Sequence, residues 1–115
     1  MDIAEKLENA LAGVLPVYGR TPEFGANTEP ERYAVYNITE FPQEFGDGGD
    51  NATQYLCRLA VFTPSLDFAL YRQIKQAMRG AGFGYSSGGQ VGTDSLFPYV
   101  THYYLDFVGV EDNND

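Results

Sequence analysis

The five residues Gly84 to Gly88, Gly-Tyr-Ser-Ser-Gly, fit the Gly-x-Ser-x-Gly pattern that surrounds the nucleophilic serine of many hydrolases. Ser86 would be the nucleophile, and Asp94 and His102, the only histidine, follow it in hydrolase order. In that chemistry the histidine takes the serine proton while the carboxylate orients the imidazole. A serine hydrolase is therefore the first function to test against the rest of the sequence.

The elements predicted around Ser86 do not provide this geometry. A nucleophile elbow needs a strand that runs into the serine and a helix that leaves it, because this sharp turn exposes the hydroxyl group and aims backbone N–H groups at the oxyanion. Here a predicted helix precedes Ser86, and a glycine-rich stretch follows it. We interpret Gly84–Gly92 as a flexible hairpin loop and His102 as a structural residue of a strand. The sequence thus predicts no catalytic residues and no enzyme.

Other patterns that could bind ions or cofactors are incomplete. Asp47 to Asn51, Asp-Gly-Gly-Asp-Asn, looks like the start of a calcium loop, but position twelve of that loop would be Arg58. Gly80 to Gly84, Gly-Ala-Gly-Phe-Gly, matches only the first two glycines of the Gly-x-Gly-x-x-Gly dinucleotide pattern, because the third glycine is not at the required spacing. The segment also lacks the strand-then-helix context of such a site. Cys57 stands in an apolar run, which favours a buried thiol. We therefore predict neither a metal nor a cofactor.

The elements that would position these residues can be read from the spacing of apolar side chains. A first amphipathic helix is predicted from apolar residues three and four apart, namely Ile3, Leu7, Ala10, Leu11 and Val14. A second helix is predicted over 66–81, with Ser65 as its N-cap and Asp67 in its first turn. Runs rich in β-branched and aromatic residues predict strands at 32–39, 53–63 and 99–110, and shorter ones within 16–20 and at 83–85.

This order of elements predicts an α+β fold, in which a mainly antiparallel sheet packs against two helices in the order α-β-β-β-α-β-β. The 115 residues suffice for one domain, which we place at 1–110, with 111–115 as an acidic disordered tail. A net charge of −9 disfavours binding to nucleic acid phosphates. The N-terminus has neither a basic region before its apolar residues nor a long apolar span, so we expect no signal peptide and no membrane association.

Several local patterns occur in a characteristic order along nearly the whole chain. An opening amphipathic helix is followed by ERYAVYNIT at 31–39, by YLCRLAVFTPSLDFALYRQIKQAMRGAGF at 55–83 and by YVTHYYLDF at 99–107. In this order they resemble the tail terminator, or tail completion, proteins of long-tailed bacteriophages. The resemblance implies a virion structural protein without catalysis. Such proteins form a ring, commonly a homohexamer, that caps the tail tube, stops its polymerisation and presents the docking surface for the head connector.

The resemblance also implies partners and a location. The partners would be further copies of the chain, the tail tube protein and the head connector, and the location would be the neck end of the virion tail after assembly in the host cytoplasm. Two alternatives stay open. The chain could be another component of the phage neck, or a small cytoplasmic binding module unrelated to phage.

Two groups of residues are candidates for contacts between subunits. Arg72, Lys75 and Arg79 share one face of the second predicted helix, and in so acidic a chain the surface that they meet could be another copy. A solvated face is the other interpretation. Phe41 and Phe45 lie in the long connection 40–51, which could be an arm that packs on a neighbour or on the tail tube. Both could instead cover the core of their own domain.

Overall fold

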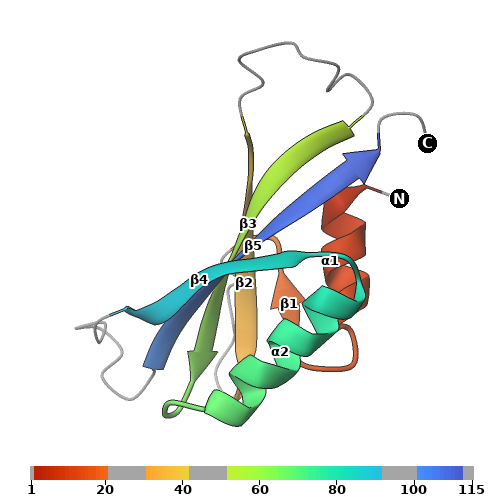
Figure 1. Ribbon diagram of the computed structural model, residues 1–115. Helices are drawn as coiled ribbons and strands as arrows, with labels where there is room; N and C mark the ends of the chain where they lie inside the picture. The colour runs from red at the N-terminus through yellow and green to blue at the C-terminus, as the bar shows by residue number, and fades with distance from the viewer. Residues whose placement is uncertain (1, 21–30, 42–51, 92–100, 113–115) are drawn as a thin grey trace.

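The computed structural model describes residues 2–20, 31–41, 52–91 and 101–112, which form two helices and five strands. The elements are α1 (Ile3–Leu11), β1 (Val17–Tyr18), β2 (Tyr33–Glu40), β3 (Ala52–Thr63), α2 (Phe68–Gly80), β4 (Gly84–Val91) and β5 (Thr101–Asp112). Both helices lie on one side of the sheet and run in opposite directions (Figure 1). The α+β class and the order α-β-β-β-α-β-β are confirmed.

The strands form one sheet in the order β1-β2-β3-β5-β4. The pairs β2·β3, β3·β5 and β5·β4 are antiparallel, whereas β1 is parallel to β2. The sheet is therefore mixed, because the chain enters β1 directly from α1 and reaches β2 in the same direction. β5 continues to Asp112, two residues beyond the predicted strand end at Val110. Residues 113–115 of the predicted tail lie outside the described residues.

Helix α1 begins where the side chain of Asp2 accepts a hydrogen bond from the Glu5 N–H at 2.8 Å, which satisfies one of the free donors of the first turn. Its apolar stripe is buried as the spacing predicted, with Leu7 and Leu11 fully covered. Burial of each leucine contributes about 1.5–3 kcal/mol. The stripe thus holds α1 against the sheet.

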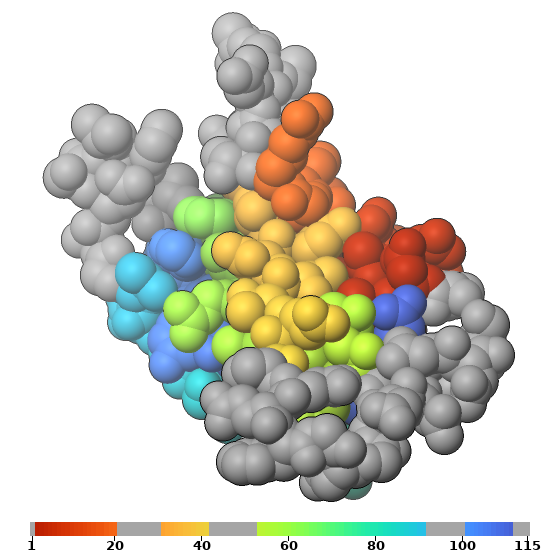
Figure 2. Space-filling model, turned by 90° about the horizontal axis from the view of Figure 1, so that it is seen from above, coloured from red at the N-terminus to blue at the C-terminus, as the bar shows by residue number. Residues whose placement is uncertain are grey.

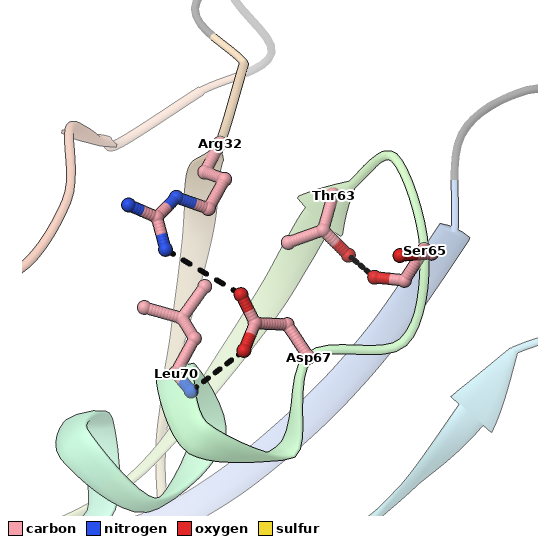
Figure 3. Close-up of polar contacts among 5 residues, drawn as sticks. All are labelled: Arg32, Thr63, Ser65, Asp67 and Leu70. Atoms are coloured by element: carbon pink, nitrogen blue, oxygen red, sulfur yellow. Dashed lines mark hydrogen bonds and ion pairs between the residues drawn. The ribbon is translucent and has the colours of Figure 1, made fainter.

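Helix α2 begins later than predicted, because Asp67 and not Ser65 is its N-cap. The Asp67 carboxylate accepts a hydrogen bond from the Leu70 N–H at 3.0 Å, and Arg32 Nη1 lies 3.4 Å from its other oxygen (Figure 3). The Ser65 carbonyl instead accepts a 2.6 Å hydrogen bond from the Thr63 hydroxyl. This leaves Leu66 outside the helix and 42% exposed, although the apolar spacing placed it on the buried face.

Helix α2 ends in a Schellman motif at Gly82, which has a positive φ of 96°. The Gly82 N–H donates to the Arg79 carbonyl and the Phe83 N–H to the Met78 carbonyl, each at 3.0 Å. The Gly80–Gly84 segment is thus a helix-to-strand turn.

The predicted flexible loop Gly84–Gly92 is wrong, because Gly84–Val91 forms strand β4 with a bulge between Tyr85 and Ser87. Two of its glycines, Gly88 and Gly89, serve packing. A Cβ atom on Gly88 would lie 2.7 Å from Tyr85 Oη and 3.0 Å from the backbone oxygen of Tyr104. The glycines that suggested a turn therefore allow side-chain and backbone atoms, including those of β5, to pack closely against β4. Gly92 lies outside the described residues.

The core lies between the helices and the odd-numbered residues of β3 and β5. Its members include Leu59, Leu105 and Phe107 from the sheet, with Ile74 and Met78 from α2. Cys57 is also fully buried there, as its apolar surroundings predicted. Burial raises the pKa of the Cys57 thiol to about 11, only partly opposed by the charge of Lys6.

Gly109 of β5 marks the tightest contact between the sheet and the first helix. A Cβ atom there would lie 2.6 Å from a Phe83 ring carbon and 2.7 Å from Ile3 Cδ1. We expect Gly109→Ala to lower the free energy of unfolding by about 1–3 kcal/mol, because a well-packed core resists added volume. Gly84→Ala is the matched control, because nothing lies within 4 Å of its added Cβ. Denaturant unfolding would contradict this packing if both variants lost equal stability.

The raised pKa of Cys57 predicts a stability change at alkaline pH. Between pH 9, the usual thiol pKa of 9.0, and pH 11, the unfolded chain ionises while the folded chain keeps its proton. The thiol therefore stabilises the fold fully below pH 9, and this contribution falls as pH rises to about 11. We expect wild type to lose more stability than Cys57→Ala over that interval, by on the order of 2 kcal/mol. Equal losses in denaturant unfolding would refute the assignment.

Candidate functional site

Side chains from four strands converge on the sheet face opposite the helices. Alternation along the strands and the pairing register place the same face of each strand there. We call it the helix-free face, and its residues are Tyr33, Val35, Asn37, Thr39, Gln54, Leu56, Arg58, Ala60, Phe62, Ser87, Gly89, Val91, His102, Tyr104, Asp106, Val108 and Val110. Many of these side chains are apolar or aromatic.

A row of rings crosses one end of this face. Tyr18 meets Tyr33 edge-on with centroids 6.1 Å apart, Tyr33 stacks on Phe62 at 5.0 Å, and Phe62 stacks on His102 at 4.6 Å. The register explains the row, because Tyr33, Phe62 and His102 are direct cross-strand neighbours. Such ring pairs contribute about 0.5–1.5 kcal/mol each beyond their burial. His102 is therefore part of the packing of the sheet, as predicted.

A paired charge occupies the middle of the same face. Arg58 Nε and Nη2 donate to the two carboxylate oxygens of Asp106 at 2.8 and 2.9 Å, and the guanidinium carbon lies 4.9 Å from the centre of the Tyr104 ring. Asp106 is 5% exposed, whereas more than half of the Arg58 side chain is exposed. The hydrogen bond to Asp106 raises the pKa of Arg58. The two charges neutralise each other, and the guanidinium plane remains accessible.

A shallow hollow of ≈ 740 Å³ opens on this face. Its lining includes Arg20, Asn37, Arg58, His102 and Tyr104. Ligand sites commonly measure about 300–1,000 Å³, so the hollow has the size to receive a small molecule or a partner side chain. Arg58 is already paired with Asp106, and Arg20 is the other arginine that lines the hollow.

The serine and the histidine of the hydrolase-like pattern, which the sequence analysis rejected as a catalytic pair, do not meet. Ser87 is opposite Asp106 on β5, whereas His102 is opposite Val91. Four residues of strand separate these two positions, about 13 Å at the usual rise per residue. Ser86 is exposed at the bulge beside Ser87. Asp94 lies outside the described residues, and the Ser86–His102 arrangement does not support hydrolase chemistry.

The predicted contact residues lie at separate places. Arg72 and Arg79 are exposed on α2, and Lys75 Nζ lies 4.4 Å from the centre of the Tyr85 ring on β4. Phe41 follows β2, is 37% exposed, and donates its N–H to the Gln54 carbonyl at 2.9 Å. The structure keeps the three cations together and places Phe41 away from them. Phe45 lies outside the described residues, as does the calcium-like segment 47–51.

Sequence reasoning missed the helix-free face as a site. The alternation of His102, Tyr104 and Asp106 was visible in the sequence, but their partners on β3 depend on the register. The pairing of Arg58 with Asp106 became visible only when the two strands were aligned.

The Arg58–Asp106 pair leads to a prediction about stability. We expect Arg58→Met to lower the free energy of unfolding by about 1–3 kcal/mol, because it leaves the buried Asp106 carboxylate without its main partner. The double variant Arg58→Met, Asp106→Val should recover most of that loss, because apolar side chains suit this face. Denaturant unfolding measures both variants. A double variant that is less stable than Arg58→Met alone would contradict this account of the pair.

Among the described residues, no three His, Cys, Asp or Glu side chains gather as a metal site would require, and neither helix is long and apolar enough to cross a membrane. Comparison with protein-family models and with curated proteins finds no family and no relative that matches this chain. The geometry of the helix-free face and of the two sheet edges is therefore the basis for the function proposed below.

Proposed function

We propose that this chain is a virion structural protein that assembles into a ring, as a tail terminator of a long-tailed bacteriophage does. The ring caps the tail tube, stops its polymerisation and offers a docking surface to the head connector at the neck of the virion. It acts without a cofactor and without catalysis. The resemblance of the sequence to tail terminators supplies the identity of the partners, and the helix-free face is the observation that supports assembly.

The argument from this face is one of burial. An antiparallel sheet with helices on one side normally turns polar residues to water on the other side. Here Val35, Ala60, Phe62 and Val108 share the second face, and Val91 and Val110 are 39% and 43% exposed. A surface of this composition is typical of protein contacts. It suits a subunit that works within an assembly.

Charge supports self-association in particular. Helix α2 carries Arg72, Lys75 and Arg79 and no acidic residue, in a chain whose net charge is −9. A cationic helix on an acidic protein is attracted to other copies of the same protein. Another component of the phage neck would share these features and stays as an alternative.

The second alternative is a small binding module that uses the hollow. Its volume of ≈ 740 Å³ favours a ligand of modest size. However, the hollow is shallow, and its central cation is already paired with Asp106. Ligand sites usually bury most of the surface of a small ligand, and a shallow hollow does not, so we favour assembly.

Mass in solution separates the ring from the module. Six copies of the 12.7 kDa chain would scatter light as a particle of about 76 kDa, and negative-stain images would show rings with a central opening. A module would remain at one or two copies, and the hollow would then be the surface to explore. A single 12.7 kDa species at all protein concentrations would contradict the ring.

A further inference from the structure

Both edges of the sheet have strands without an outer partner among the described residues. β4 is the last strand on one side, and its sequence, Gly-Tyr-Ser-Ser-Gly-Gly-Gln-Val, has no charged residue and no proline. On the other side β1 pairs only with Ala34 and Val35, so the Asn37–Glu40 half of β2 is the free edge. Natural sheets usually protect such edges with charges or proline, because an unprotected edge pairs with another strand.

The helices above these two edges carry opposite charge. Over β4, the α2 stripe consists of Arg72, Lys75 and Arg79, and the Lys75–Tyr85 contact fixes its position at that edge. On α1 the acidic stripe consists of Asp2, Glu5 and Glu8, which are all exposed, and Glu8 is the member that contacts β2.

One contact fixes the Glu8 end of the acidic stripe at β2. The Tyr36 hydroxyl of β2 donates to Glu8 Oε2 at 2.9 Å, which places this flank of α1 over β2. Lys6 lies on the other flank, with its Nζ 5.3 Å from the centre of the Phe83 ring. Figure 2 shows α1 in red and β4 in cyan on opposite sides of the molecule. The acidic and basic stripes therefore border opposite edges of one sheet.

We propose that β4 and α2 of one copy join β2 and α1 of the next copy, so that the sheet and the helix layer continue from subunit to subunit. The contact rests on the ring proposed above and names its two surfaces. It is heterologous, because the two edges differ, and a heterologous contact that closes on itself gives a ring.

Strand direction and helix direction both fit this arrangement. β4 runs opposite to β2 within the sheet, so β4 of one copy meets β2 of the next as an antiparallel pair. α1 and α2 run in opposite directions within one subunit (Figure 1), and α2 would meet the next α1 in the same way. Each charged stripe covers about two helical turns, roughly 9–11 Å, so the two stripes match in length.

Charge reversal tests the helix part of the contact. Arg72→Glu with Arg79→Glu should raise the protein concentration needed for assembly about tenfold or more, and Glu5→Lys with Glu8→Lys should do the same. All four changes in one chain should restore assembly, because the stripes are again opposite and the net charge is still −9. Gln73→Glu is the control, because Gln73 is exposed and turned about 100° from Arg72 around α2. Light scattering gives the mass, and thermal melting shows that each monomer is folded.

Hydrogen exchange tests the strand part without any substitution. In wild type, amides within Gly84–Val91 and Asn37–Glu40 should gain protection between dilute and concentrated protein, while those at the centre of β3 and β5 stay protected throughout.

The outcomes separate this contact from the ring itself. Rings whose mass survives both reversals, a fourfold variant that stays dissociated although folded, or edge amides without added protection in assembled wild type would each overturn the edge contact and leave the ring in place. Wild type that never exceeds 12.7 kDa overturns the ring and the contact together.

Discussion

The antiparallel pairing of β3 with β5 is the constraint on which the rest of the structure depends. Both strands have 12 residues and pair along their whole length without a shift. A single register therefore decides which side chains of these two central strands share each face of the sheet. A slip of β5 by one residue would turn Leu105 out of the core and bring Asp106 into it beside Leu59, while Arg58 stayed on the other face without its partner. The core and the helix-free face are thus two results of one register.

The helix layer depends on this pairing in turn. Both helices need an apolar surface for their buried stripes, and the odd-numbered residues of β3 and β5 provide it. Because α1 and α2 share that surface side by side, each has one flank over an outer strand, β2 for α1 and β4 for α2. The charged residues outside the two buried stripes therefore reach opposite edges of the molecule. The separation of charge follows from the packing of the core.

Local patterns predicted much of this fold, and the errors occurred where tertiary contacts decide. The apolar spacing located α1, and β-branched and aromatic runs located β2 and β3 to within about one residue. The N-cap was misplaced because Ser65 and Asp67 are both good caps, and they differ in tertiary and turn contacts, with Arg32 beside Asp67 and the Thr63 hydroxyl bonded to the Ser65 carbonyl. The Gly84–Val91 strand was missed because close packing needs glycine as much as turns do. The cations of α2 could be named from spacing, but the acidic stripe and the helix-free face required the register and the packing of α1.

Net charge and local charge have different consequences for the proposed contact between copies of this chain. A net charge of −9 repels copies in most orientations, and this general repulsion opposes nonspecific aggregation. In orientations that bring the α2 stripe of one copy to the acidic stripe of another, the local electrostatic interaction is attractive. Each exposed ion pair contributes only about 0.2–1 kcal/mol, so it is too weak to hold two subunits alone. Together with strand pairing at the same edge, the charges are better suited to select the orientation than to supply the affinity. In the proposed contact, the backbone edge, which is uncharged and pairs with almost any strand, would supply the affinity, and the charges would supply the orientation.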